Sequence, residues 1–229
     1  MSIKIINGNI FNTKLQTVVN TVNCVGVMGK GIALVFKLRY PEMFDLYANH
    51  CKNGNIEIGK LWLYKGEKNA PLVLNFPTKF HWKYPSKMEY LEKGLEKFCN
   101  TYKQQGITSI AFPLLGAHNG GLEKEDVLSI MKKYLTICDI PIEIYEYDPN
   151  ESDDLFENFK TNWIALSPLQ IKEHTSISKD KIVTISSAIE TGKVNSMIGL
   201  INEKGIGLKT MEKCFRFIMN ERAEQQKLF

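Results

Sequence analysis

Short apolar segments alternate with helical patterns through residues 1–147, and this alternation constrains the fold more than any other feature. The strand candidates, bounded by Gly, Pro or Asn, are IKII, TVVNTVN, KLWLYKG, PLVLNFP, SIAFPLLG and PIEIYEY. One helix is expected over SKMEYLEKGLEKFCNTY, where Ser86 and Glu89 have capping-box spacing, and another carries Val127 and Ile130 on one face. The alternation predicts an α/β domain of three layers, with helices on both faces of a mixed, mostly parallel sheet.

The pattern changes after Tyr147, where the strand candidates end. The polar, acidic stretch DPNESDD has the character of a linker, which we expect over residues 148–160. Residues 161–229 are expected to form a small all-α accessory domain. The sequence therefore predicts two domains, the first of which ends at residue 147.

Composition excludes several functional classes. No apolar run approaches the roughly 18 to 20 residues that span a bilayer, and IKII lies near the start of the chain in place of a signal peptide, so a cytoplasmic protein without membrane contact is expected. The five cysteines contain no C-x-x-C, and the four histidines do not supply metal-ligand spacing around them, so neither a metal nor a cofactor is predicted. A formal charge of +4 is compatible with a polyanionic partner but is too small to indicate one.

Two glycine-rich loops each connect a strand candidate to a helix. After TVVNTVN, Gly29 and Gly31 flank Lys30 as a helix begins, and PLLGAHNGGL has three glycines ahead of the next helix. Ligands of open α/β sheets bind in loops at the carboxyl ends of strands. Glycines there let backbone N–H groups approach a phosphate, and a helix N-terminus favours its charge. Neither loop has a Walker or G-x-G-x-x-G sequence, so the loops are either tight turns or a clasp for a diphosphate.

Four ordered segments resemble the macrodomains, which are ADP-ribose-binding modules. They are GNIF at 8–11, VNTVNCVGVMGKGIALVFKLRYP at 19–41, NFPTKFHWKYPS at 75–86 and PLLGAHNGGL at 113–122. The resemblance covers residues 1–147 and is strongest to the branch that contains terminal ADP-ribose protein glycohydrolase and DarG, the DNA ADP-ribosyl glycohydrolase antitoxin. It implies the macrodomain fold, with Asn20 and Asn23 on the distal ribose and the two loops around the diphosphate.

The resemblance also implies a full set of ADP-ribose contacts. These residues are Asn9, Ile10, Asn20, Asn23, Met28, Gly29, Lys30, Gly31, Ile32, Thr78, Gly116, Ala117, Asn119, Gly120, Gly121 and Leu122. Asn9 occupies an adenine-contacting position that is often Asp in macrodomains. Its amide oxygen can still accept a hydrogen bond from the adenine amino group, but without the contribution of a charge.

Lys79 is the candidate for catalysis, because in this branch the lysine at its position acts on the anomeric carbon of the distal ribose. An amine whose pKa is lowered by partial burial can attack that carbon or form an imine with the opened sugar, and the alternative is electrostatic positioning. The protein-directed relative has an acidic residue in the second loop, whereas GAHNGGL has none. Histidine is a residue type commonly used for proton transfer, so His118 is the candidate for that role, with shaping of the loop as the alternative.

One stretch near the C-terminus, LINEKGIGLKTMEKCFRF, resembles a helix-hairpin-helix. Such hairpins contact the DNA backbone, because N–H groups at a helix N-terminus point at phosphate and nearby lysines add charge. The expected DNA-backbone contacts are Lys204, Gly205, Gly207 and Lys209. The alternative is a hairpin that only packs on its neighbours. No toxin-binding domain of the DarG type is recognised in this stretch.

Together these features predict a macrodomain hydrolase that removes ADP-ribose from a modified nucleobase, thymine in DNA, as an antitoxin or repair activity. The expected partners are ADP-ribose or ADP-ribosylated nucleic acid, the DNA backbone at the C-terminal domain, and a cognate ADP-ribosyltransferase toxin. Three alternatives stay open: an ADP-ribose 1″-phosphate phosphatase, a hydrolase of ADP-ribosylated protein, and a non-catalytic ADP-ribose reader.

Overall fold

The computed structural model describes residues 3–66 and 70–226, and six strands of this part form one sheet. The strands are β1 (Ile3–Gly8), β2 (Thr17–Asn23), β3 (Trp62–Tyr64), β4 (Leu72–Lys79), β5 (Ile110–Pro113) and β6 (Ile142–Tyr147). Their order across the sheet is β1-β6-β5-β2-β4-β3; every neighbouring pair is parallel except β3 with β4. The predicted mixed, mostly parallel sheet is confirmed, and each strand candidate overlaps one strand, although β1 and β4 extend beyond their candidates.

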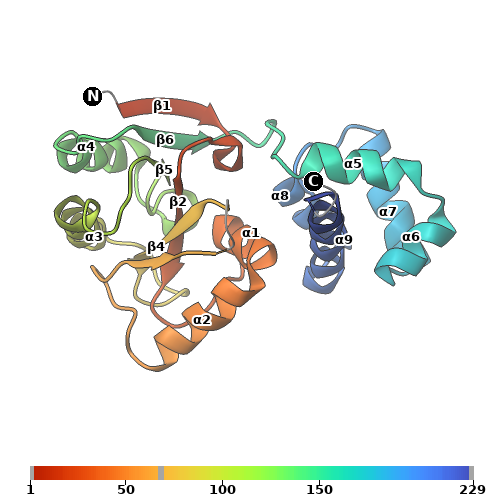
Figure 1. Ribbon diagram of the computed structural model, residues 1–229, viewed down its shortest axis with the longest axis horizontal. Coiled ribbons are helices and arrows are strands. Elements are labelled where there is room, and N and C mark those ends of the chain that lie inside the picture. Colours follow the sequence, from red (N-terminus) through yellow and green to blue (C-terminus); the bar gives the residue numbers. More distant parts are fainter. Residues whose placement is uncertain (1–2, 67–69, 227–229) are drawn as a thin grey trace. The chain divides into compact units, whose positions relative to one another are not determined.

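Four helices cover the two faces of this sheet (Figure 1). They are α1 (Gly31–Arg39), α2 (Pro41–Lys52), α3 (Met88–Thr101) and α4 (Lys124–Leu135), with single 3-10 turns η1 (Ile10–Asn12) and η2 (His118–Gly120) in the loops. Helices α1 and α2 pack on one face, and α3 and α4 on the other. The three predicted layers are therefore present.

Strand β2 shows why the sheet needs helices on both faces. Val18 and Val22 belong to the apolar cluster under α1 and α2, whereas Val19 belongs to the cluster under α3 and α4. Successive side chains of a strand point to opposite faces, so a strand that is apolar at successive positions must be covered on both sides. Each of these valines is almost wholly buried.

The predicted capping box at the start of α3 is absent. The helix begins at Met88, and its N-cap residue is Lys87, whose side chain makes no capping hydrogen bond. Ser86 lies one residue too early and is buried, with its N–H donating to the carbonyl of Gly120 at 2.9 Å. The tertiary contact of Ser86 therefore replaces the local one that its spacing to Glu89 suggested.

The chain divides into two compact units, Met1–Tyr147 and Asp148–Phe229. The second unit is helical over its described residues; residues 227–229 of the predicted accessory domain lie outside them. Its helices are α5 (Phe156–Ala165), α6 (Pro168–Thr175), α7 (Lys179–Glu190), α8 (Met197–Ile201) and α9 (Leu208–Gln226). A core of large apolar side chains, including Phe156, Phe159 and Trp163, holds this unit together.

Helix α5 begins inside the segment 148–160 that was predicted to be a linker, and this boundary is corrected. The cause is Asp153, which is buried and accepts hydrogen bonds from the N–H groups of Leu155 and Phe156 at 3.1 and 3.0 Å. Its second carboxylate oxygen accepts from the N–H of Met197 at the start of α8, at 2.7 Å. An acidic residue that resembled linker composition is thus a cap that joins two helices.

No helix in the described part of the chain is long and apolar enough to cross a membrane. Within those same residues, no three His, Cys, Asp or Glu side chains gather in a way that could hold a metal ion.

Candidate functional site

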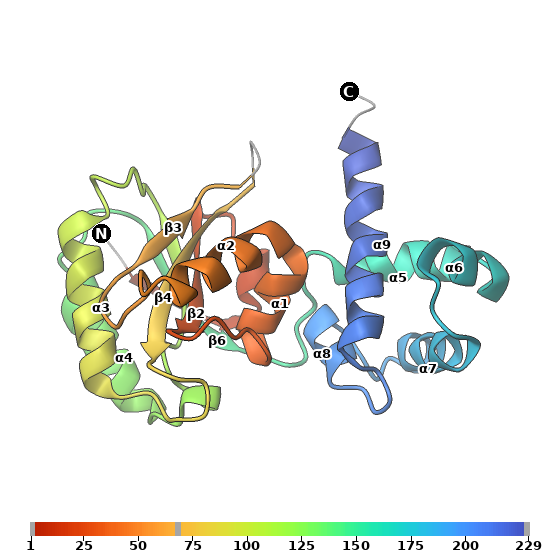
Figure 2. The same cartoon turned by 90° about the horizontal axis from the view of Figure 1, so that it is seen from below.

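Three loops leave the sheet at one edge, because the carboxyl ends of its parallel strands all lie there. The first loop (residues 24–30) follows β2, the β4–α3 loop (residues 80–87) follows β4, and the second loop (residues 114–122) follows β5. Strands β5, β2 and β4 are neighbours in the sheet, so the three loops are neighbours as well. Figure 2 shows the chain turning back from the tip of β4 toward α3 at this edge.

Asn23 builds the first loop. Its side-chain oxygen accepts from the N–H groups of Val25 and Val27 at 3.0 and 3.3 Å, and its amide nitrogen donates to the carbonyl of Val27 at 2.5 Å. The hydroxyl of Tyr47 on α2 donates to the Asn23 carbonyl at 2.6 Å. The side chain thus shapes the turn, and its contact with a ribose stays a prediction.

The start of α1 offers unpaired backbone donors to an anion. Lys30 is the extended N-cap residue, and its side chain makes no capping hydrogen bond. Gly31 has a φ of +57°, a conformation that favours glycine. The first N–H groups of a helix have no partners within it, and they carry the positive end of the helix dipole. A diphosphate beside Gly29 and Gly31 would accept hydrogen bonds from these N–H groups, and its negative charge would interact favourably with the helix dipole.

The second loop is packed tightly onto Ser86. A Cβ atom on Gly116, whose φ is +67°, would lie 3.0 Å from the Cβ of Ser86 and 2.9 Å from Leu122 Cδ1. A Cβ on Gly120 would lie 2.6 Å from Ser86 Oγ. The Leu122 N–H closes the loop by donating to the Gly116 carbonyl at 3.1 Å. Only glycine allows this approach at both positions.

Asn119 connects the two loops and Lys79. A Cβ on Gly31 would lie 2.6 Å from the amide nitrogen of Asn119, so the start of α1 and the second loop touch. The Lys79 amine donates to the backbone carbonyl of Asn119 at 2.6 Å. The structure therefore brings together the glycines of both loops and the lysine that the sequence singled out.

Burial lowers the pKa of the Lys79 amine below that of an ordinary lysine. A lower pKa increases the fraction of neutral amine, which is the nucleophilic form. The thiol of Cys24, at the start of the first loop, has the opposite property: burial raises its pKa to about 11, so it remains protonated near neutral pH. Of these two groups, Lys79 is the one suited to attack an electrophilic carbon.

His118 is exposed on the second loop and has a φ of +49°. A residue other than glycine rarely adopts this conformation, which indicates that the surrounding loop holds it there. The position leaves the imidazole accessible to a bound molecule. Its role in proton transfer stays a prediction.

Two of the predicted contact residues, Asn20 and Asn9, are buried beneath the surface of the protein. Asn20 has no exposed surface, and its amide nitrogen donates to the side-chain oxygen of Asn75 at 2.9 Å. These residues are register partners on β2 and β4. Asn9 is buried too; its oxygen accepts from the Phe11 N–H at 3.2 Å, and its amide nitrogen has no partner. Asn9 therefore has a donor left over for a ligand.

The other predicted contacts differ in exposure. Ile10, Met28, Thr78 and Gly120 are buried, whereas Gly29, Lys30, Asn119 and Gly121 are exposed and Ile32, Ala117 and Leu122 are half-buried. The exposed residues all belong to the two loops and are accessible to a ligand. Met28 and Gly120 belong to the same loops but are buried within them.

Sequence reasoning missed three supporting residues: Tyr47, Asn75 and Ser86. Asn75 and Ser86 both lie in the segment NFPTKFHWKYPS, and Ser86 was assigned to a helix cap. Tyr47 is one of several apolar or aromatic side chains on α2, and burial raises the pKa of its hydroxyl, which therefore stays a donor. No local pattern distinguishes these residues, since each acts across a distance in sequence.

A hairpin connects α8 and α9 in the helical unit. Gly205 has a φ of +89° there, and Ile206 is buried and anchors the turn. Lys204, Gly207 and Lys209 are exposed. Two helices joined by a short connection that contains Gly205 and Gly207 are therefore present, and the resemblance to a helix-hairpin-helix stays a prediction. Contact of this hairpin with DNA is a prediction that no feature of the structure tests.

The family model described as "Macro domain" matches residues 19–131 of this chain. Among curated proteins, the "DNA ADP-ribosyl glycohydrolase" of Mycobacterium tuberculosis is 44% identical over 142 residues, which are 61% of this chain and 40% of the relative. That of Thermus aquaticus is 39% identical over 224 residues, 94% of this chain and 60% of the relative. A "DNA ADP-ribosyl transferase-DNA ADP-ribosyl glycohydrolase fusion protein" of Thermosipho africanus is 38% identical over 63% of this chain and 42% of its own length.

Solved structures of the same three proteins match the first unit. The "Macrodomain of Thermus aquaticus DarG" has a TM-score of 0.61 at 38% identity. The matched region comprises 98% of that structure and 63% of the present chain. The corresponding M. tuberculosis macrodomain has a TM-score of 0.60 at 44% identity, with 97% of it and 63% of this chain covered. "Thermosipho africanus DarTG in complex with ADP-ribose" has a TM-score of 0.60 at 38% identity, over 41% of that chain and 63% of this one. The present chain spans 40% to 60% of the length of the three curated relatives.

Proposed function

Since the chain belongs to the macrodomain family, we propose that it is an ADP-ribosyl glycohydrolase that removes ADP-ribose from modified thymine in DNA. The relatives named DNA ADP-ribosyl glycohydrolase support this substrate class. The biological role would be that of an antitoxin or a repair enzyme.

The observation that carries the proposal is the position of the Lys79 amine. It donates to the Asn119 carbonyl at 2.6 Å, beside the glycines of both loops, and burial lowers its pKa. A diphosphate held by the loops directs the distal ribose of ADP-ribose toward this amine. A reader or a phosphatase has no need for a partly buried amine at this place.

In the proposed reaction, the neutral amine of Lys79 attacks the anomeric carbon of the distal ribose. The bond from that carbon to the base nitrogen breaks, and the base leaves with the electron pair and takes up a proton. His118 is the group we assign to this proton transfer. Water then attacks the same carbon, and the Lys79 nitrogen, which still carries both of its protons, leaves as the neutral amine. The proton that the water loses returns to His118, so ADP-ribose is released and both side chains are restored. No other reactant is needed.

A direct comparison of substrates tests the proposal. Purified protein is offered an ADP-ribosylated thymidine oligonucleotide, an ADP-ribosylated protein and ADP-ribose 1″-phosphate at equal concentrations. We expect free ADP-ribose and unmodified oligonucleotide from the first and much slower turnover of the others. Release of inorganic phosphate from the third as the fastest reaction would show a phosphatase, and binding without any product would show a reader.

The pH dependence of turnover distinguishes a nucleophilic from an electrostatic Lys79. If the neutral amine is required, kcat rises with pH as the amine loses its proton and levels off above the Lys79 pKa. Because burial lowers that pKa, the plateau begins below the value of about 10.4 for an ordinary lysine. A kcat that falls as pH rises through the same region would indicate that the charged amine acts. The measurement is single-turnover kinetics on the modified oligonucleotide.

We further propose that a DNA ADP-ribosyl transferase supplies the substrate. The T. africanus relative that carries both names in one chain supports this pairing. Cells whose growth is inhibited by such a transferase should grow again when they also express this protein, but only when Lys79 is intact. Rescue by Lys79→Ala would show that protection comes from binding rather than hydrolysis.

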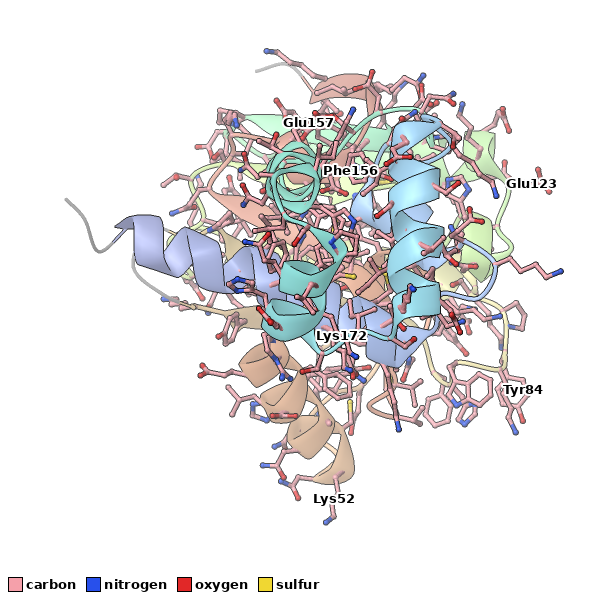
Figure 3. All side chains as sticks on the ribbon, turned by 90° about the vertical axis from the view of Figure 1, so that its right-hand side faces the viewer. Lys52, Tyr84, Glu123, Phe156, Glu157 and Lys172 are labelled. Atoms are coloured by element: carbon pink, nitrogen blue, oxygen red, sulfur yellow. The ribbon has the colours of Figure 1, made fainter. Side chains whose placement is uncertain are left out.

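The hairpin of the helical unit is proposed to contact DNA phosphates. Changing Lys204 and Lys209 to alanine should weaken binding to long unmodified duplex DNA. Each lost phosphate contact lowers the slope of log affinity against log salt by about 0.9, so the slope should fall by about 2. Lys172→Ala with Lys179→Ala is the control, since it removes the same charge from exposed positions of the same unit; Figure 3 labels Lys172. An equal effect of both pairs would assign the binding to net charge and leave the hairpin a packing element.

A further inference from the structure

The β4–α3 loop carries three aromatic side chains that face solvent. Phe80 is 60% exposed, Trp82 49% and Tyr84 62%. In the described part of the chain, every other Phe, Trp or Tyr whose side chain is placed is buried or half-buried. Figure 3 shows Tyr84 among the outermost side chains of its unit. Exposed aromatic residues gathered in one place mark an interaction surface rather than ordinary surface composition.

This loop is held in a defined shape. Its first carbonyl, that of Phe80, accepts from the Cys24 N–H of the first loop at 3.2 Å. Near its other end, the Ser86 N–H donates to the Gly120 carbonyl of the second loop at 2.9 Å. Within it, the Tyr84 N–H donates to the His81 carbonyl at 3.1 Å. The aromatic rings therefore do not have to be ordered on binding, which reduces the cost of an interaction.

The rings form a continuous platform with positive charge beside it. The His81 ring lies 5.6 Å from Trp82 and 5.5 Å from Tyr84, centroid to centroid. The Lys83 amine lies 5.2 Å from the centre of the Trp82 ring, and Lys87 is exposed at the end of the loop. The Lys87 amine forms a long ion pair with Glu89 at 3.7 Å, and the two side chains are 60% and 58% exposed, so solvent and salt screen this pair. The loop itself contains no acidic residue.

A cavity adjoins the platform. Its volume is about 310 Å³, and it is lined by Phe80, Tyr84, Pro85, Lys87 and Tyr90. This is near the lower end of the range for small-molecule sites, about 300 to 1,000 Å³, and it suits a flat ring with its sugar. Phe80 directly follows Lys79 in the chain, so the β4–α3 loop begins immediately after the lysine of the proposed reaction.

We propose that the β4–α3 loop binds the unmodified nucleotides next to the modified base, in single-stranded DNA. Aromatic rings stack on any base, and lysines between them bind the phosphates. Proteins that bind single-stranded nucleic acids commonly combine these two features. A duplex does not offer base faces, because they are stacked on one another. The inference rests on the proposed function for its substrate, but the binding of plain single strands is independent of catalysis. An acidic peptide fits the lysines alone and leaves the rings without a partner.

The test uses the full chain and compares three substrates. They are a ten-nucleotide unmodified oligothymidylate, a five-nucleotide oligothymidylate with one ADP-ribosylated base, and a single ADP-ribosylated thymidine. The variant is Trp82→Ala with Tyr84→Ala, and Trp82→Phe keeps a stacking ring. Leu46→Ala with Ile137→Ala is the matched control, because it removes two exposed apolar side chains elsewhere on the same unit.

Loss of the two rings should raise the Kd for the unmodified oligonucleotide and the KM for the modified one, each by at least about tenfold. The kcat and the turnover of the single modified nucleotide should stay within about twofold, because a binding contact remote from the reacting bond changes KM. Trp82→Phe and the Leu46/Ile137 control should behave like the unchanged protein. The helical unit is the same in every variant, so any contribution that it makes to oligonucleotide binding is equal on both sides of each comparison.

Two results would overturn the inference. One is an oligothymidylate affinity that does not change when the rings are removed. The other is an equal loss of affinity for a ten-residue glutamate peptide, which would show a general surface for acidic polymers. If no modified DNA is turned over at all, the proposed function fails, and the binding arm with unmodified DNA still decides the role of this loop.

Discussion

Lys79→Ala should lower kcat on the modified oligonucleotide by at least about a thousandfold and leave the Kd for ADP-ribose within about threefold. The Lys79 amine is the nucleophile in the proposed reaction, and a group used mainly in the transition state affects kcat rather than binding. A positioned catalytic group contributes about 10² to 10⁴ in rate even when it only transfers a proton. Single-turnover kinetics and calorimetry with ADP-ribose measure the two quantities separately.

Two further substitutions separate the roles of this side chain. Lys79→Gln keeps a donor for the Asn119 carbonyl, which the amine contacts at 2.6 Å, and Lys79→Arg keeps the positive charge. Both should be as inactive as Lys79→Ala if the amine is a nucleophile. An active Lys79→Arg would identify an electrostatic role, and a normal kcat with a raised KM in Lys79→Ala would move the residue to the binding set.

Gly116→Ala should weaken ADP-ribose binding by at least about thirtyfold. The added methyl group would lie 2.9 Å from the end of the Leu122 side chain and 3.0 Å from the Cβ of Ser86. Leu122 can turn aside, but the Cβ of Ser86 is fixed to its backbone, so we expect the second loop to shift relative to Ser86. Displacement of that loop also moves Asn119, and with it the carbonyl that holds Lys79. Calorimetry with ADP-ribose gives the affinity, and thermal unfolding shows whether the unit remains folded.

Gly54→Ala is the matched control for backbone strain. Gly54 has a φ of +70°, close to the +67° of Gly116, but a Cβ there has nothing within 4 Å. Both substitutions therefore pay the left-handed penalty of about 1 to 2 kcal/mol for a residue other than glycine, and only one displaces a loop. The Kd of Gly54→Ala should equal that of the unchanged protein. Equal affinities for the two variants would remove the second loop from the binding site.

The elements of the first unit are predictable from sequence because their signals are local. Each strand candidate overlaps one strand, and the glycines at 29 and 31 flank the start of a helix as expected. The errors have local causes too. Ser86 was placed in a capping box because the spacing to Glu89 fits, and Asp153 was placed in a linker because its neighbours are acidic and polar. Each residue instead contacts a distant backbone group, Ser86 through its own N–H and Asp153 through its carboxylate, and a local pattern cannot show such a contact.

In the candidate site, too, some features follow from local sequence and others depend on contacts between distant residues. Residue types and order determined that this chain has two glycine loops at strand ends, a lysine after NFPT and a family resemblance. Only the tertiary structure decided that Lys79 reaches Asn119, 40 residues away, and that Asn20 pairs with Asn75. It also decided that Ser86 supports two of the three glycines of the second loop, Gly116 and Gly120. The physical reason is the strand order β5-β2-β4, which places the ends of strands distant in sequence side by side. Periodicity and turn chemistry act between near neighbours in the chain, whereas the distances between loops are set by how the sheet assembles and its two faces are packed.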